Sequence, residues 1–156
     1  MSEIQRRKDV RLKGYDYAQA GAYFVTICTA DKKCLLSRVS TGSAPTWQPQ
    51  IIMSDYGKIA EKYIRSMAGI ERYVIMPNHI HFILIKGNDC KRTLAQDVRS
   101  FKTLVTKEIG RSIWQRLYYE HVVRDEKDYL IKAKYIEDNP AKWTDDEMYV
   151  INEIHP

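Results

Sequence analysis

Two histidines separated by one residue stand at the start of an apolar run. The run covers residues 73–86, YVIMPNHIHFILIK, and the pair is His79 and His81. Side chains alternate between the two faces of a strand, so both imidazoles share one face, about 6.7 Å apart, while Ile80 and Phe82 point to the other. Two imidazole nitrogens at this spacing can bind one divalent metal ion. The pair therefore predicts half of a metal site, although strand histidines without any ligand also produce it.

A tyrosine and an asparagine four residues apart lie near the end of the last predicted helix. Tyr135 and Asn139 belong to the segment YIEDN, and this spacing places them one above the other on one helical face. If that face covers the sheet beside His79 and His81, Asn139 can complete a three-ligand metal site with open positions for a phosphate oxygen. Tyr135 would then point at that phosphate.

This set of side chains favours chemistry on a phosphodiester. Three neutral ligands leave the double positive charge of an ion available to stabilise a charged transition state. Hydrolysis needs only water, whereas a tyrosine can store the broken ester as a phosphotyrosine bond for later rejoining. Free tyrosine has a pKa of about 10, so forming the phenolate at neutral pH costs about 4 kcal/mol. The metal, or Lys132 one turn earlier on the helix, is a candidate for lowering this cost.

Each of these residues also has an ordinary structural explanation. Asn139 precedes Pro140 at a helix end, where asparagine commonly stops a helix for backbone reasons. His121, on the preceding predicted strand, is an alternative third ligand, although a hydrogen-bonded structural histidine is commoner there. Tyr135 could be a core aromatic, and Tyr129 at the start of the helix is the next candidate for the nucleophile.

The composition is that of an ordinary soluble protein. The chain has 156 residues, of which 44% are hydrophobic and 29% charged, and its net charge is +5. We expect one domain over residues 1–156 with a basic arm over 1–20, and a modest attraction to nucleic acid. No apolar run could cross a membrane and no export signal is visible, so we expect a cytoplasmic protein. Cys28, Cys34 and Cys90 lack disulfide or zinc spacing and are expected to be reduced.

Hydrophobic periodicity predicts alternating strands and helices, with Ser54 and Asp125 as helix caps. Strands are predicted at 22–29, 50–53, 70–76, 79–86 and 117–123, and helices at 55–67, 93–109 and 125–138. Residues 35–49 are typical of a hairpin tip or loop. This order predicts an α+β fold of the ferredoxin-like split βαβ type, an antiparallel sheet with helices packed on one face. A C-terminal helix, within 125–139, carries the tyrosine.

Several linked motifs give the chain a resemblance to a known family. They are RLKGYDY at 11–17 followed by GAYFVTIC at 21–28, MPNHIH at 76–81, VRSFK at 98–102, WQR at 114–116 and YIEDNP at 135–140. On these motifs, which span most of its length, the chain resembles the single-tyrosine HUH transposases of small insertion sequences. The group of REP-associated tyrosine transposases is the most similar.

The resemblance implies a role for the motif residues. His79 and His81 match the HUH metal ligands, with Ile80 as the bulky apolar residue between them. Tyr135 matches the nucleophile that takes a 5′-phosphate from single-stranded DNA and frees a 3′-hydroxyl. Relatives in the insertion-sequence branch carry a glutamine third ligand four residues after the tyrosine, where this chain has Asn139. The resemblance also implies magnesium or manganese as the cofactor, and single-stranded DNA or a DNA hairpin as the partner.

Basic residues are candidates for contacts to the DNA backbone. They are Arg6, Arg7 and Arg11 in the arm, and Arg92, Arg99 and Lys102 on the predicted helix 93–109. Solvated basic helix faces also occur without any ligand.

The favoured function is metal-dependent nicking and rejoining of single-stranded DNA by a transposase. Two alternatives stay open. A ferredoxin-like sheet can bind single-stranded nucleic acid without catalysis, and a His-x-His pair occurs in cupin-type oxygenases, although this chain has too few strands for that fold. The sequence does not determine which DNA sequence is recognised. It also does not determine whether the protein is a monomer or a homodimer that exchanges its last helices, or whether this copy is mobile or domesticated.

Overall fold

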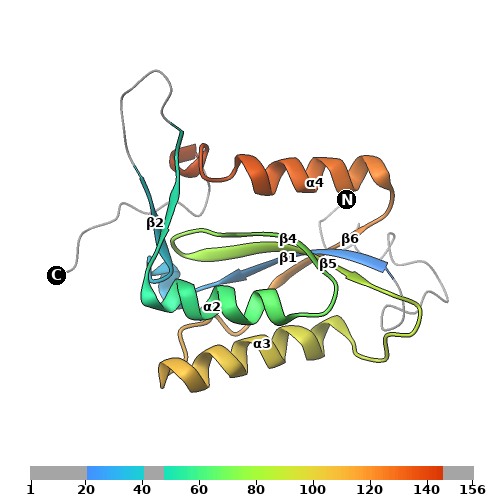
Figure 1. Cartoon of the computed structure of the whole chain (residues 1–156), viewed down its shortest axis with the longest axis horizontal. Helices are drawn as coiled ribbons and strands as arrows, with labels where there is room; N and C mark the ends of the chain where they lie inside the picture. The colour runs from blue at the N-terminus through green and yellow to red at the C-terminus, as the bar shows by residue number, and fades with distance from the viewer. Residues whose placement is uncertain (1–20, 41–47, 146–156) are drawn as a thin grey trace.

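A four-stranded antiparallel sheet forms the centre of the molecule (Figure 1). The structure, a computed structural model, describes residues 21–40 and 48–145, so Arg6, Arg7 and Arg11 of the predicted arm lie outside the described residues. The strands are β1 (Gly21–Cys28), β4 (Ile70–Ile75), β5 (His79–Lys86) and β6 (Tyr119–Val123), in the spatial order β4-β5-β1-β6. All three pairings are antiparallel. This is the order of a split βαβ fold, and the α+β prediction is confirmed.

Two helices cover one face of this sheet (Figure 1). They are α2 (Asp55–Ser66) and α3 (Leu94–Ile109), and both begin within one residue of the predicted start. Ser54 Oγ accepts a hydrogen bond from the Gly57 amide, and Thr93 forms a capping box with Gln96. Gly110 ends α3 at φ 93°, the left-handed conformation that glycine adopts without strain.

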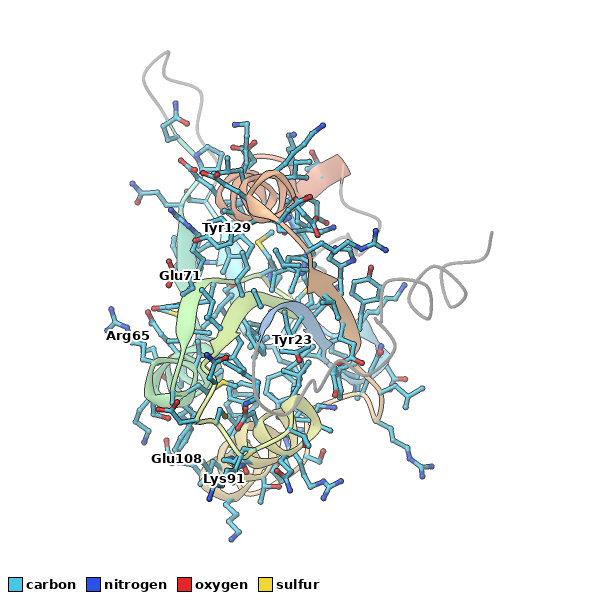
Figure 2. The ribbon with its side chains drawn as sticks, turned by 90° about the vertical axis from the view of Figure 1, so that its right-hand side faces the viewer. Tyr23, Arg65, Glu71, Lys91, Glu108 and Tyr129 are labelled. Carbon is cyan, nitrogen blue, oxygen red and sulfur yellow. The ribbon has the colours of Figure 1, made fainter. Side chains whose placement is uncertain are left out.

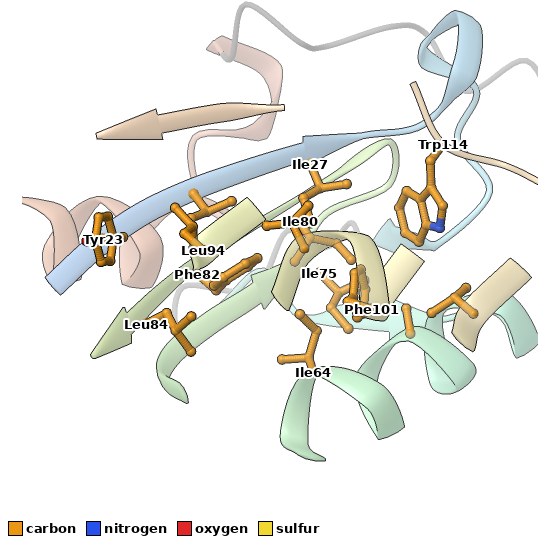
Figure 3. Close-up of a cluster of buried hydrophobic side chains, with 14 of the residues drawn as sticks. Tyr23, Ile27, Ile64, Ile75, Ile80, Phe82, Leu84, Leu94, Phe101 and Trp114 are labelled. Carbon is orange, nitrogen blue, oxygen red and sulfur yellow. The ribbon is translucent and has the colours of Figure 1, made fainter. Parts of the chain in front are cut away.

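The main hydrophobic core lies between these two helices and the sheet. Val25 and Phe82 come from the central strands, whereas Ile64 and Phe101 come from α2 and α3, and all four are at most 2% exposed. Figure 3 shows the labelled members of this cluster packed between the strands and the helices. Burial of side chains of this size stabilises the fold by about 1.5–3 kcal/mol each.

A third helix, α4 (Glu126–Asp138), covers the opposite face of the sheet (Figure 1). Asp125 caps it as predicted, since its carboxylate accepts from the Asp128 amide at 2.8 Å. Ala133 and Ile136 of α4 pack in a second apolar cluster with Phe24 and Ile83 of the sheet. The face of the sheet that α4 covers carries the side chains of interest for function.

Two details differ from the predicted elements. The segment 35–49 contains a strand, β2 (Ser37–Val39), which pairs with β3 (Ile51–Met53) in a small separate sheet. The last strand begins at Tyr119 rather than at residue 117, because Leu117 lies outside the sheet and is 78% exposed.

Short 3₁₀ helices lie at Ala30–Lys32 (η1) and Trp143–Asp145 (η2). None of the helices within the described ranges has the length and apolar character needed to cross a membrane.

Replacing Gly57 by alanine is expected to destabilise the protein by about 1–3 kcal/mol. A Cβ atom there would lie 2.0 Å from the carbonyl oxygen of Leu36, in backbone that cannot easily move. This clash outweighs the gain of about 1 kcal/mol that alanine brings to a helix interior. Urea unfolding of the variant measures the change in the free energy of unfolding.

Gly87→Ala is the matched control, because a Cβ atom at Gly87 meets nothing within 4 Å. We expect no loss of stability there. Equal stability of the Gly57 and Gly87 variants would contradict this description of the contact between α2 and the chain before β2.

Candidate active site

The pairing of β1 with β5 places His79 and His81 on the face that α4 covers. Thr26 lies opposite His81 in the register, and the two imidazole rings lie 4.5 Å apart between their centres. His79 is fully buried and His81 is 5% exposed. Phe24 of β1 stacks on the His81 ring at 5.3 Å. The pair thus sits inside an apolar face, where an ionised side chain is disfavoured.

Each imidazole is held through its Nδ1 atom. His79 Nδ1 lies 2.8 Å from Oδ1 of Asn78, whose Nδ2 donates to the carbonyl oxygen of Lys32 at 3.3 Å. Because this amide oxygen can only accept, Nδ1 of His79 must carry a proton, which leaves Nε2 as the nitrogen that can bind a metal. His81 Nδ1 is similarly bonded to Thr26 Oγ1 at 2.8 Å. Such partners are typical of metal-binding histidines, whose second nitrogen coordinates the ion.

Two of the predicted metal ligands, His81 and Asn139, carry a buried polar atom without a hydrogen bond among the described residues. Four buried side-chain nitrogen or oxygen atoms make no hydrogen bond within the described part of the chain. They are Nε2 of His79, Nε2 of His81, Oδ1 of Asn139 and Nε1 of Trp114. A buried polar atom in this state destabilises a fold by about 1–3 kcal/mol. For His81 and Asn139, a metal ion would provide the missing interaction, so the donor set fits the predicted ion.

Three residues on one side of α4 and of the turn after it lie near the two histidines. Tyr135, Asn139 and Trp143 are spaced four residues apart. The Tyr135 ring centre lies 5.2 Å from that of His81, and the Trp143 ring centre lies 6.0 Å from that of His79. Asn139 stands between these two contacts in the chain and is 3% exposed, and its Nδ2 donates to the Tyr135 carbonyl. The side that carries these three residues therefore faces the histidines.

Tyr135 combines contact with His81 and access to solvent, since the residue is 43% exposed. Tyr129, the other candidate nucleophile, points instead to the edge strand β4, where its hydroxyl donates to Glu71 Oε1 at 3.2 Å (Figure 2). A phenol at the rim of the site can meet a molecule from solution while its ring remains against the imidazole.

His121, the alternative third ligand, has another partner. Its Nε2 atom lies 2.8 Å from Oδ2 of Asp128, which ties β6 to the first turn of α4. No group of three or more His, Cys, Asp or Glu side chains within residues 21–40 and 48–145 could hold a metal. A site at His79 and His81 would therefore take its third ligand from an amide such as Asn139, or from water.

The surroundings keep His81 neutral. Burial lowers the pKa of His81 well below its ordinary value near 6.5, and the neighbouring His79 and Lys132 lower it further. A neutral imidazole is the form that binds a metal.

Of the predicted DNA-binding residues, Arg99 and Lys102 lie on α3, which covers the other face of the sheet (Figure 1), and Arg92 lies just before this helix. Arg92 donates to Asp97 Oδ1 at 2.9 Å and to Ser100 Oγ at 2.7 Å. Lys102 Nζ donates to the Gln115 carbonyl at 2.7 Å, and burial lowers its pKa. Arg99 is exposed. The structure does not bring these residues together with His79 and His81, and their role in DNA binding stays a prediction.

Four residues of this site were absent from the sequence-based prediction, namely Phe24, Thr26, Asn78 and Trp143. Asn78 adjoins His79 in the chain, so its polar side chain was an available signal. Thr26 is 55 positions from His81, and only the strand register brings the two together.

Comparison with known proteins gives a consistent set of relatives. The chain is 33% identical to an uncharacterised protein of Haemophilus influenzae, across 94% of this chain and 95% of that protein. It is 30% identical to a putative REP-associated tyrosine transposase of the same species, across 81% of this chain and 74% of the relative. A REP-associated tyrosine transposase of Escherichia coli is 36% identical over 47% of this chain and 44% of its own length.

Comparison of the fold with solved structures indicates the same family. A solved structure of a REP-associated tyrosine transposase bound to a REP hairpin matches with a TM-score of 0.59 and 25% identity, over 84% of this chain and 74% of that one. No protein-family model matches. Because sequence relatives, fold and motifs agree, the chain belongs to the REP-associated tyrosine transposase family and is an enzyme of the transposase class.

Proposed function

We propose that this transposase nicks and rejoins single-stranded DNA in a metal-dependent reaction, through a covalent bond between Tyr135 and a 5′-phosphate. The observation that carries the proposal is the contact of the half-exposed Tyr135 ring with His81 at 5.2 Å, beside the buried ligand atoms of His81 and Asn139. Nucleophile and metal ligands of one chain would then share one face of the sheet, so the reaction needs no second copy. A homodimer stays a prediction.

The reaction is a balanced exchange of phosphate esters. The Oη atom of Tyr135 forms a bond to phosphorus, and the bond between phosphorus and the 3′-oxygen breaks. The phenol releases its proton, and the departing oxygen takes up a proton to become a 3′-hydroxyl. Because one phosphodiester replaces another, a 3′-hydroxyl can later attack the phosphotyrosine and rejoin DNA without an external energy source.

His79, His81 and Asn139 would hold a magnesium or manganese ion. When bound, the ion supplies Lewis-acid stabilisation of the charge that develops on the phosphate. The protein orients these ligands: Asn78 holds the His79 ring, Thr26 holds the His81 ring, and α4 presents Asn139. Rigid elements on both sides of a site keep its geometry ready before substrate arrives.

The DNA partner is inferred from the solved relative, which is bound to a REP hairpin. We infer that this chain also takes a DNA hairpin or the single strand beside one. Its net charge of +5 favours association with a polyanion. The reaction would take place in the cytoplasm.

Tyr135→Phe is expected to abolish the covalent adduct, with a loss of at least about 10³-fold, because the nucleophilic oxygen is removed. A labelled DNA hairpin with single-stranded flanks, incubated with Mn²⁺, reports the adduct on a denaturing gel. Tyr129→Phe is the matched control and should form the adduct normally. If the Tyr135 variant forms it as fast as the unmodified protein, the nucleophile is misassigned. Binding in chelator without any adduct under any condition would favour the non-catalytic alternative.

Asn139→Ala should weaken Mn²⁺ binding at least about tenfold, because the amide oxygen is a proposed ligand. His121→Gln should leave the affinity within about threefold, since the His121 imidazole already pairs with Asp128. Calorimetric titration of each variant with Mn²⁺ measures the two affinities. The opposite order of losses would assign the third ligand to His121.

The depressed pKa of His81 predicts how the stability of the metal-free protein varies with pH. In the unfolded chain His81 takes up a proton near pH 6.5, whereas in the folded protein it stays neutral to well below that value. The unfolded state therefore binds more protons below pH 6.5, and His81 should lower the free energy of unfolding by up to about 1.4 kcal/mol per pH unit as the pH falls.

Urea unfolding between pH 7 and 5 in the presence of chelator measures this slope. His81→Gln removes the titrating group, so its stability should fall less steeply with decreasing pH. Parallel curves for the two proteins would refute the assignment.

A further inference from the structure

Lys132 places a positive charge beside the candidate active site. Its Nζ atom lies 5.1 Å from the centre of the Phe24 ring. Phe24 in turn stacks on His81 at 5.3 Å and meets the Tyr135 ring edge-on at 6.0 Å. Lys132 precedes Tyr135 by three residues on α4, so both side chains lie on neighbouring turns of one helical face. One aromatic ring thus links the ammonium, an imidazole and the phenol.

Within the described residues, the charge of Lys132 is not balanced by a carboxylate. Among the residues that the structure describes, no Asp or Glu oxygen is paired with Lys132, whereas Lys134 and Lys142 of the same segment pair with Asp138 at 3.1 and 4.0 Å. The positive field of Lys132 reaches His81, where it helps to lower the imidazole pKa. A half-buried lysine whose ammonium lies over an aromatic ring, near the neutral imidazole of His81, attracts an anion from solution.

We propose that Lys132 binds a non-bridging oxygen of the phosphodiester that Tyr135 attacks. This inference rests on the proposed function and deepens it by adding a substrate-contacting residue. The compact, flexible ammonium suits a phosphate oxygen, and the Phe24 ring beneath it limits the positions that the lysine stem can occupy. The contact strengthens as charge builds up on the phosphate, so Lys132 would support both binding and the chemical step.

The test compares Lys132→Met with Lys134→Met. Methionine keeps an apolar stem over Phe24 and removes the charge, and Lys134 is a matched control because it lies on the same helix with 74% of its side chain exposed. Binding of a labelled DNA hairpin with single-stranded flanks is measured in chelator, where no cleavage occurs. Loss of one phosphate contact should reduce the salt slope by about 0.7 and the affinity about fivefold at 0.1 M salt. The Lys134 variant should stay within about twofold.

A series of DNA strands, each with one neutral methylphosphonate, then locates the contact. At one position, neutralising the phosphate should weaken binding by the unmodified protein but not by the Lys132 variant, because the same charge pair is already lost. With Mn²⁺, that position should coincide with the phosphate that becomes attached to the protein. With ordinary DNA and Mn²⁺, Lys132→Met should form the adduct about 10²-fold more slowly, while its Mn²⁺ affinity is not reduced.

The two proposals fail in different ways. One outcome is that methylphosphonates weaken binding by the Lys132 variant and by the unmodified protein equally at every position. Another is that the position where they differ is not the phosphate of the adduct. In either case Lys132 does not bind the attacked phosphate, and the proposed reaction still stands. If the unmodified protein forms no adduct with Mn²⁺, the proposed reaction is refuted, and the binding series in chelator still decides whether Lys132 contacts a phosphate.

Discussion

The antiparallel pairing of β1 with β5 is the constraint on which the candidate site depends. Its register sets Thr26 opposite His81 and directs both imidazoles to the face under α4. A slip of one residue would turn the histidines toward α2 and α3 and bring Ile80 and Phe82 out of the main core. The apolar packing of one face therefore enforces the register that the polar residues of the other face require. Core stability and site geometry come from the same set of backbone hydrogen bonds.

The face under α4 keeps polar atoms where an ordinary core would hold only apolar ones. Phe24, Ile83 and Ile136 form an apolar cluster on the same face as His79 and His81. Burial in these surroundings keeps the His81 imidazole neutral, and the bond between its Nδ1 atom and Thr26 fixes the orientation of the ring. The rest of the packing offsets the cost of leaving Nε2 of His81 without a hydrogen bond, which favours a site formed before its ligand arrives.

The parts of the fold that local patterns determine could be predicted from the sequence, and the parts that depend on distant contacts could not. The helix caps at Ser54 and Asp125 lie where predicted, because capping depends on a side chain and amides a few residues away. The strand β2 was missed, because three residues are too few to show an alternating pattern and their partner strand β3 lies farther along the chain. Within the site, the Thr26 hydroxyl was missed for the same reason, since its bond to His81 depends on strand register.

A single helix then contributes most of the proposed chemistry, so its position on the sheet controls the site. At its first turn, Asp128 bonds to His121 of β6 at 2.8 Å. In its middle, Ala133 and Ile136 pack on the sheet, and just beyond its end the Trp143 ring lies against His79. Three contacts spaced along the axis leave α4 little freedom to rotate or slide. A rotation that exposed Asn139 would also withdraw Ala133 and Ile136 from the apolar cluster, so the packing of α4 resists the motion that would disperse the proposed ligands.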